Sequence, residues 1–327
     1  MPREIPPIAF GPVPSRRLGR SLGINNVPPK ACSYSCVYCQ VGPTPERAIA
    51  PRAFRAPREV IGAVGARVRA LRERGEPIDF LTFVPDGEPT LDRHLGEEIE
   101  GLRPLGVPIA VISNGSLAWR AEVRDALGRA DWVSFKVDAV TEEVWRRVDR
   151  PAPSLDRERV LDGMLRFAAA FRGTLVSETM LVRDVNDGDA SIDATAAFLE
   201  RLRPRTAYVA VPTRPPAEAW VRPAREEAVN RAFQRFAARL PRVELLTGFE
   251  GTAFGTTGDP AEDLLAVAAV HPMREDAALG LLARAGADRA LLDRLVAEDR
   301  LRRIGYEGHT FYVRRLAEAA SDEGAAP

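Results

Sequence analysis

Short apolar runs alternate along most of this chain with segments whose apolar residues recur at helical spacing. Val60, Val64, Val68 and Leu71, for example, fall on one face of a helix. Strands that alternate with helices predict βαβ units around a parallel sheet, so the predicted fold class is α/β. The predicted strands are residues 21–24, 79–84, 108–112, 131–137, 174–182, 207–211 and 243–246, and the predicted helices are residues 60–71, 91–102, 117–127, 161–171, 192–202 and 229–240.

The number of these units favours an incomplete barrel. Six or seven units in about 230 residues fit an open or partial barrel better than the complete eightfold one. We therefore predict a partial (β/α)6 TIM-like barrel over residues 1–250, in which residues 1–20, rich in Pro and Arg, form an irregular leader. In such folds the chemistry lies at the carboxyl ends of the strands, so the residues after each strand are the candidates for a site.

The composition changes after a segment rich in Gly and Thr at residues 247–259, which is predicted to be a linker. Helices are predicted at 260–269, 274–285 and 289–298, and two short strands at 302–306 and 310–314 flank a turn at Gly308. Helices followed by a hairpin predict a small winged-helix-like domain over residues 259–327. A helical cap that only packs on the barrel is the alternative that this pattern leaves open.

The charge balance limits the classes of partner. The chain has 327 residues with 46 Lys or Arg and 46 Asp or Glu, so its net charge is zero. This balance argues against a nucleic-acid coat protein, whose phosphate contacts need a basic surplus. Arg16, Arg17 and Arg20 form a local basic patch that either holds phosphate or is simply solvated.

Targeting and membrane segments are missing from the sequence pattern. No stretch approaches the roughly 18 apolar residues of a membrane span. The first residues lack the apolar core of a signal peptide. We therefore expect a cytoplasmic protein that does not contact a membrane.

The three cysteines of the chain, Cys32, Cys36 and Cys39, lie within eight residues of each other. Disulfides are rare in the cytoplasm, and an odd number of thiols would leave one unpaired. Three thiolates at C-x3-C-x2-C spacing can bind three irons of a [4Fe–4S] cluster and leave the fourth iron open. The alternative is a Cys3His zinc site, for which the three histidines are all distant in sequence: His94, His271 and His309.

The spacing of these cysteines, with Tyr38 before the last of them, resembles the signature of radical S-adenosylmethionine (SAM) enzymes. The resemblance implies a [4Fe–4S] cluster ligated by Cys32, Cys36 and Cys39, with SAM bound at the open iron beside Tyr38. It also implies reductive cleavage of SAM to a 5′-deoxyadenosyl radical, fed by a one-electron reductant similar to flavodoxin or ferredoxin. In such enzymes the protein binds, orients and shields the cofactor.

Two further segments resemble the SAM-binding motifs of this superfamily. Gly87, Glu88 and Pro89 follow the predicted strand at 79–84 and resemble a Gly-Gly-Glu-Pro motif, with Asp86 in place of the first Gly. The resemblance implies contact with the SAM amino group, whereas a plain turn before a helix capped by Thr90 is the alternative. Side chains after the next strand are predicted to contact the SAM carboxylate or ribose, or to form a turn: Ser113 and Asn114.

Polar residues also interrupt two predicted strands. Period-2 alternation places Lys136 and Asp138 on the face opposite Val133, Phe135 and Val137, and therefore inside the barrel. We predict that they are catalytic: Lys136 either binds a carboxylate or forms a Schiff base. A structural ion pair is the alternative.

Two more polar positions follow from the same strand pattern. Glu178 is predicted to accept a hydrogen bond from a ribose hydroxyl, unless it lies on a solvated edge. Arg214, after the next strand, is a candidate for binding a substrate anion. Only two of the 46 basic residues are lysines, and the second, Lys30, lies two residues before Cys32.

The cysteines and four further segments resemble the radical SAM group similar to wyosine-base synthases, which modify a tRNA purine. These segments are residues 14–19, 28–30, 83–90 and 212–216. The resemblance covers roughly residues 10–250. One cluster uses all three cysteines, so a second cysteine-bound cluster is excluded. The sequence therefore predicts a radical SAM enzyme whose substrate is unidentified, with an RNA base as one option. The alternative is a metal-cluster sensor that acts through a C-terminal winged helix.

Overall fold

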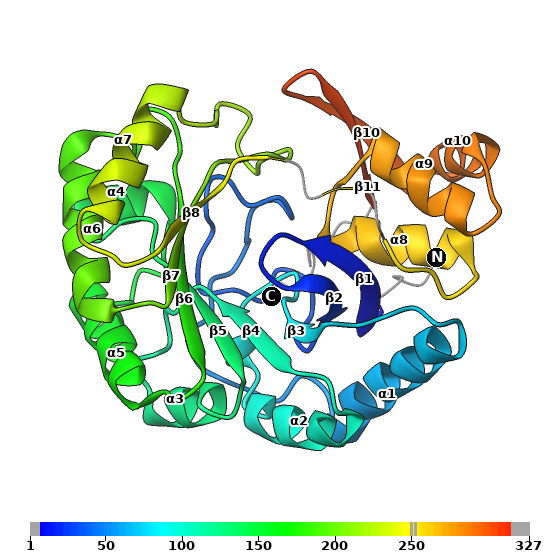
Figure 1. Ribbon diagram of the computed structural model, residues 1–327, viewed down its shortest axis with the longest axis horizontal. Helices are drawn as coiled ribbons and strands as arrows, with labels where there is room; N and C mark the ends of the chain where they lie inside the picture. Colours follow the sequence, from blue (N-terminus) through cyan, green and yellow to red (C-terminus); the bar gives the residue numbers. More distant parts are fainter. Residues whose placement is uncertain (1–6, 249–250, 252–253, 315–327) are drawn as a thin grey trace, which may run out of the picture.

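One curved sheet of eight strands forms the centre of the molecule (Figure 1). The computed structural model describes residues 7–248, 251 and 254–314 of the chain. Strands β2 to β8 are parallel, and β1 pairs with β2 in the antiparallel direction. The strands follow one another in chain order: β1 (Ala9–Ser15), β2 (Gly19–Ile24), β3 (Phe80–Phe83), β4 (Ile109–Ser113), β5 (Trp132–Lys136), β6 (Thr174–Met180), β7 (Thr206–Ala210) and β8 (Val243–Leu246).

Helices cover the outer face of this sheet (Figure 1). In the described part of the chain, six strands from β2 to β7 are each followed by helix, so the predicted partial barrel of six units is confirmed. The helices are α1 (Pro57–Glu73), α2 (Leu95–Leu102), α3 (Ala121–Leu127), α4 (Glu142–Val148), α5 (Arg157–Ala170), α6 (Asp189–Leu202) and α7 (Glu226–Ala237), with short 3-10 turns at η1 (Pro89–Leu91) and η2 (Arg103–Leu105).

Alternation along the strands sorts side chains between the two faces of the sheet. Val133, Phe135 and Val137 are buried in the main apolar core with residues of the outer helices. Lys136, between them, lines a cavity on the inner face. The predicted alternation therefore holds for Lys136, because successive strand residues point to opposite sides. Asp138, which follows the end of β5, does not line the cavity as predicted.

The irregular leader expected at residues 1–20 is wrong for its described part. Residues 9–15 and 19–24 form a β-hairpin with an irregular register between Phe10 and Val13. Gly11 and Pro12 concealed this strand, because glycine and proline are read as breaks. Proline is nevertheless tolerated in an edge strand, and β1 is the edge of the sheet. Residues 1–6 lie outside the described residues.

Helix α4, seven residues long, was not predicted. Its Trp145 is buried and donates an indole N–H hydrogen bond to the Tyr34 hydroxyl at 3.1 Å. The same rings pack edge to face, with centroids 5.9 Å apart. Helix α4 therefore supports the segment that carries the cysteines.

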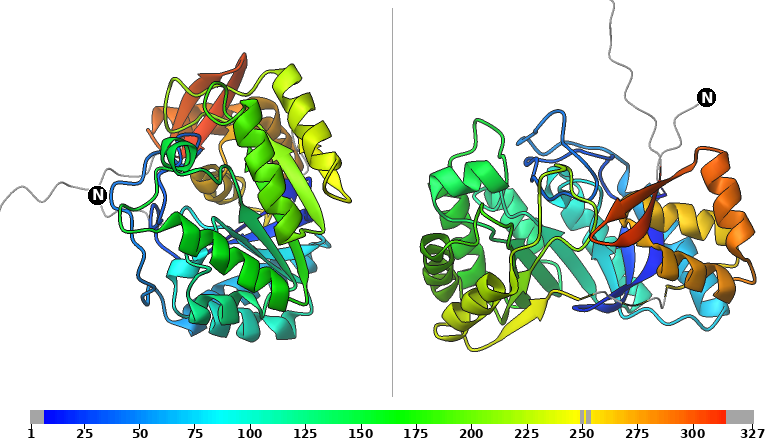
Figure 2. Two further views of the ribbon diagram at one scale, coloured as in Figure 1. Left: turned by 90° about the vertical axis from the view of Figure 1, so that its left-hand side faces the viewer. Right: turned by 90° about the horizontal axis from the view of Figure 1, so that it is seen from above.

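The C-terminal unit contains α8 (Pro260–Val270), β9 (Met273–Arg274), α9 (Glu275–Arg284), α10 (Arg289–Ala297) and the hairpin β10 (Leu301–Tyr306) and β11 (His309–Arg314). All three predicted helices and both strands are present. Strand β9, only two residues long, was not predicted and pairs with β11 to complete a three-stranded antiparallel sheet. The unit stands at one side of the barrel, with its hairpin and helices together (Figure 2).

The C-terminal unit shares an apolar core with the first strand of the barrel. Phe10 and Val13 of β1 pack with α8, α9 and α10. The segment expected to be a linker is packed where the structure describes it: Phe254 is buried, and the Gly255 N–H donates to the Pro12 carbonyl at 2.8 Å. The boundary between domains at residues 250–259 stays a prediction, as does the winged-helix assignment.

None of the helices in the described residues combines the length and the apolar character needed to cross a bilayer.

Candidate active site

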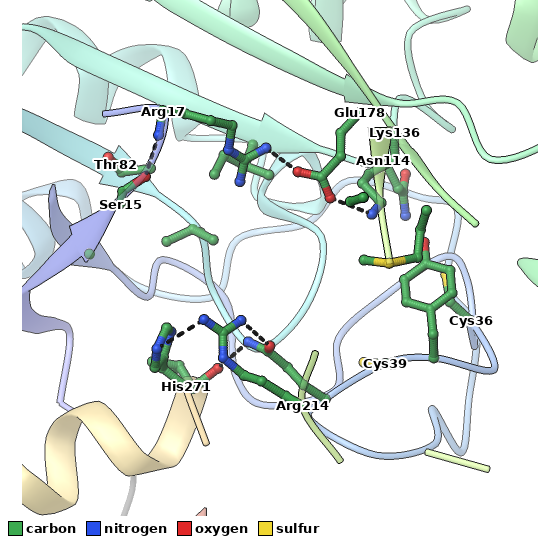
Figure 3. A pocket seen from close by; sticks show the side chains of 18 of the residues that line it. Ser15, Arg17, Cys36, Cys39, Thr82, Asn114, Lys136, Glu178, Arg214 and His271 are labelled. Carbon is green, nitrogen blue, oxygen red and sulfur yellow. Dashed lines mark hydrogen bonds and ion pairs between the residues drawn. The ribbon is translucent and has the colours of Figure 1, made fainter. Parts of the chain in front are cut away.

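The inner face of the barrel opens into a cavity of about 370 Å³ at the carboxyl ends of the strands (Figure 3). Two of the predicted site residues, Pro89 and Asp138, do not line it. The ten that do come from the cysteine loop and from the ends of β3 to β6: Cys32, Cys36, Tyr38, Cys39, Gly87, Glu88, Ser113, Asn114, Lys136 and Glu178.

The cysteine loop is held in place by its backbone. The Ser35 N–H donates to the Asp149 carbonyl at 3.1 Å, and the Val37 N–H donates to the Val148 carbonyl at 3.0 Å. Both acceptors lie at or just beyond the end of α4. These bonds satisfy buried backbone groups that a loop otherwise leaves unpaired.

Gly87 anchors the other side of the cysteine loop. A Cβ placed on Gly87 would lie 2.1 Å from the carbonyl oxygen of Ala31, so no side chain fits. On either side of this contact, the Lys30 N–H donates to the Asp86 carbonyl and the Glu88 N–H donates to the Ala31 carbonyl, both at 2.8 Å. Glycine is therefore required by the close approach of two backbones.

Glu88 is fully buried and organises the ends of β3 and β4. Its Oε1 accepts hydrogen bonds from the Thr90 hydroxyl at 2.6 Å and the Ser113 hydroxyl at 2.7 Å, and its Oε2 accepts one from the Asn114 N–H at 2.8 Å. Burial raises the pKa of this carboxyl, and these donors oppose that rise. Both carboxyl oxygens of Glu88 therefore accept hydrogen bonds from other groups of the protein. Pro89 is buried behind them and accepts a bond from Asn26 at 3.2 Å.

Asn114 connects β4 to the cysteine loop. Its Nδ2 donates to the Ser33 hydroxyl at 2.9 Å and lies 3.7 Å from the Cys32 sulfur. Ser33 in turn contacts the Ser116 hydroxyl at 2.6 Å. Side chains that the sequence proposed for SAM thus also fix the position of Cys32.

The three thiols are free and suit an iron–sulfur cluster. Burial and the nearby Glu88 raise the pKa of Cys32 to about 12, and burial raises that of Cys36 well above its usual range. Thiolates here therefore require the positive charge of bound metal. Among the described residues, no three His, Cys, Asp or Glu side chains converge on a single ion.

Lys136 and Glu178 form a buried ion pair inside the barrel, with Nζ and Oε1 2.7 Å apart (Figure 3). Arg17 reaches in from the β1–β2 turn and pairs with the other oxygen of Glu178. Although burial opposes it, Asp138 and Glu178 raise the pKa of Lys136. A protonated amine is not nucleophilic, so the geometry disfavours the Schiff-base option. Strand β6 lies between β5 and β7, so the solvated-edge alternative for Glu178 is wrong.

Asp138 lies behind the cavity wall. It accepts a hydrogen bond from the Tyr38 hydroxyl and another from the Met180 N–H at 2.7 Å. Lys136 lies over the Tyr38 ring, with Nζ 4.8 Å from the centroid, and 4.0 Å from Asp138. Asp138 therefore orients Tyr38 and Lys136 rather than facing the cavity.

Asp149 and His271 are among the residues of the cavity wall that sequence reasoning missed. Asp149, just after α4, lies 3.4 Å from the Cys36 sulfur, and burial beside Asp138 raises its pKa. His271, at the end of α8, contacts Arg214 at 3.1 Å, while Arg214 also donates to Gln40 at 2.9 Å (Figure 3). Burial and the Arg214 charge hold the pKa of His271 well below its usual range. The sequence indicates no role for His271 beyond that of a candidate zinc ligand.

Comparison with known proteins decides the family. Residues 26–196, from the cysteine loop into α6, match the Radical SAM superfamily. The chain belongs to this superfamily. As a radical SAM enzyme it uses a [4Fe–4S] cluster and SAM, so the superfamily and the two cofactors implied by the resemblance are confirmed.

One relative of this radical SAM enzyme matches most of the chain. It is 42% identical to a UPF0026 protein of Methanocaldococcus jannaschii over 94% of this chain and 96% of that one, so it also belongs to the UPF0026 family. A radical SAM methyltransferase from Sphaerobacter thermophilus shares the fold at 18% identity, with a TM-score of 0.51 over 69% of this chain and 66% of that one.

A further solved structure aligns with most of the chain. A structure of TYW1 with a lysine-pyruvate adduct bound aligns over 90% of this chain and 80% of that one, at 14% identity and a TM-score of 0.45. TYW1 therefore lies among the structural neighbours of this radical SAM enzyme.

Proposed function

We propose that Cys32, Cys36 and Cys39 hold the cluster, and that the enzyme abstracts hydrogen from a substrate bound between the cysteine loop and the Lys136–Glu178 pair. The observation that carries this proposal is that all three thiols and this ion pair line one cavity. When bound, the cluster supplies one electron that cleaves the sulfonium of SAM and yields the 5′-deoxyadenosyl radical.

The residues of the chain divide into two roles in this proposal. Lys136, held protonated beside Glu178, binds an anionic group of SAM or of the substrate. Asp138 is a positioning residue, since it acts through Tyr38. Gly87, Glu88, Pro89, Ser113 and Asn114 shape the SAM side of the cavity, and their contacts with the cysteine loop support this role.

The electron needs a donor outside this chain, and we propose a flavodoxin- or ferredoxin-like protein. A reducing compartment such as the cytoplasm suits free thiols and an iron–sulfur cluster. The sensor alternative gains no support, because the C-terminal unit shares its core with β1 and places His271 in the cavity wall.

An RNA base is the finer substrate proposal. Arg16 lines the mouth of the cavity and is exposed, and Arg20 is exposed nearby in sequence. The described C-terminal residues 259–314 add no basic surplus, since they contain eight Arg and ten Asp or Glu. RNA binding would therefore depend on the barrel, and Arg16→Ala with Arg20→Ala should weaken salt-dependent tRNA binding. Binding that is absent or independent of salt contradicts the RNA proposal.

Anaerobic reconstitution tests the reaction itself. We expect about four irons per chain and SAM-dependent release of 5′-deoxyadenosine under a strong one-electron reductant. Cys36→Ala should abolish both, whereas Ser191→Ala on α6, far from the loop in sequence, should change neither. Stoichiometric zinc with no iron in the wild-type protein contradicts the proposal.

A further inference from the structure

Each cysteine of the loop has a different polar neighbour. The Cys39 sulfur lies 3.5 Å from the ammonium nitrogen of Lys30. The Cys36 sulfur lies 3.4 Å from a carboxyl oxygen of Asp149, and the Cys32 sulfur lies 3.7 Å from the amide nitrogen of Asn114. Lys30, the basic side chain among these neighbours, therefore lies beside Cys39, one of the three proposed ligands of the cluster.

The placement of Lys30 is fixed at both ends. Its backbone N–H donates to the Asp86 carbonyl at 2.8 Å, and its ammonium also donates to the carbonyl of Gly42, just beyond Cys39. Its side chain thereby spans from the Gly87 contact to the far end of the cysteine loop.

The backbone at Lys30 makes the residue type informative. Its φ is +64°, in the left-handed region that glycine adopts without steric cost and other residues rarely occupy. The chain nevertheless has a lysine here, and it has only two lysines beside 44 arginines. A lysine presents its charge as a compact point on a flexible stem, which suits a single sulfur acceptor.

We infer that Lys30 is a positioning residue that raises the reduction potential of the cluster, through its charge and its N–H···S contact at Cys39. This inference rests on the proposed function, because it assumes that the three cysteines hold the cluster. Reduction adds one electron from the external one-electron reductant and moves no proton. A fixed positive charge favours the more negative, reduced state, and hydrogen bonds to sulfur act in the same direction.

The test is the midpoint potential of the reconstituted full-length protein, followed by electron paramagnetic resonance during a redox titration. Lys30→Met keeps the apolar stem and removes the charge. We expect the ratio of reduced to oxidised cluster at a fixed potential to fall about tenfold, which is a shift of about 59 mV for one electron. Lys30→Arg keeps the charge and should stay within about threefold of wild type. Arg69→Met, on the exposed face of α1, is the control for the loss of a distant charge and should leave the ratio unchanged.

Lys30→Gly distinguishes the loss of the charge from a loss of folding, since glycine readily adopts the backbone conformation at this position. We expect it to bind iron as wild type does and to show the same fall in potential as Lys30→Met. An unchanged potential in either neutral variant at full iron content overturns the inference, as does failure of both to hold iron. A wild-type protein that takes up no iron would instead contradict the proposed function, so the two failures are distinct.

Discussion

Gly87 and Ala31 lie in backbone contact, with no room for a methyl group between them: a Cβ on Gly87 would meet the Ala31 carbonyl oxygen at 2.1 Å. Gly87→Ala should therefore push the cysteine loop away and destabilise the fold by about 1–3 kcal/mol. Iron content after reconstitution is the measurement, and we expect it to fall by more than half. Gly62→Ala on α1, where a Cβ meets nothing within 4 Å, is the matched control and should bind iron normally. Normal iron content in Gly87→Ala would show that the loop adapts.

Glu88 is the common acceptor for groups at the ends of two strands. Glu88→Ala leaves the Thr90 and Ser113 hydroxyls and the Asn114 N–H without their buried acceptor. We expect a loss of about 3–5 kcal/mol in the free energy of unfolding, measured with urea. Glu97→Ala, at an exposed position of α2, should change it by less than about 0.5 kcal/mol. Equal effects of the two variants would contradict the proposed network.

The pair of Glu178 with Lys136 and Arg17 predicts a pH dependence. These cations outweigh burial and lower the pKa of Glu178 from 4.5 to about 2. A carboxyl with a lowered folded pKa stabilises the protein above its unfolded pKa, and this contribution is lost as the pH falls through the folded pKa. Glu178→Gln should thus cost about 3 kcal/mol above pH 5, and the cost should shrink from pH 4.5 toward pH 2.

Urea unfolding of wild type and Glu178→Gln at several pH values checks this expectation. Glu200→Gln, which breaks an exposed pair with Arg239, should cost less than about 1 kcal/mol at every pH. A Glu178→Gln deficit that stays constant down to pH 2 would rule out the ion pair as its origin.

Asp86 predicts the opposite dependence. Both of its carboxyl oxygens are buried without a hydrogen-bond partner among the described residues. Burial raises its pKa from 3.8 to about 8, although the charges of Lys30 and Arg314 oppose the rise. The folded protein then holds a proton that the unfolded chain releases, so stability falls as the pH rises from about 4 to about 8.

Asp86→Asn removes this titration and should be more stable than wild type at pH 8. The difference in unfolding free energy should grow with pH by up to about 1.4 kcal/mol per unit. Thermal or urea unfolding across this range measures it, with Asp125→Asn at an exposed position of α3 as the control. A difference that is flat with pH would mean that Asp86 is ionised in the folded state.

Asp263 joins the C-terminal unit to the barrel. Its buried carboxylate lies 2.7 Å from the Arg67 guanidinium of α1 and accepts the Thr256 hydroxyl and the Thr257 N–H, each at 2.7 Å. Asp263→Ala should cost about 3–5 kcal/mol, because Arg67 keeps a half-buried charge without this partner. Since Phe10 and Val13 share one core with α8, we expect one cooperative unfolding transition. Two separate transitions in calorimetry would instead support independent domains.

Local pattern was sufficient for the repeated units and for the cysteine loop. A strand or helix reveals itself over four to fifteen residues, as at 174–182, which was predicted as a strand and contains β6 (Thr174–Met180). Cys32, Cys36 and Cys39 share one loop, so their spacing in the sequence is enough to predict that they bind one iron–sulfur cluster. The inward position of Lys136 followed from the two-residue period of β5.

Local pattern failed where packing overrules it. Residues 9–15 contain Gly11 and Pro12 and form a strand only because β2 offers an edge to pair with. Arg17 belongs to a basic patch in the sequence, yet it turns inward because Glu178 gives it a buried partner.

The sequence by itself determined the α/β repeat, the spacing of the three cysteines and the superfamily, because each depends on residues close together in the chain. Only the tertiary structure decided that Asp149 and His271 border the same cavity as the cysteines, that Tyr38 donates a hydrogen bond to Asp138, and that Lys30 faces Cys39. These contacts join segments that are far apart in the chain. The packing of the whole sheet brings them together, and no spacing in the sequence predicts it.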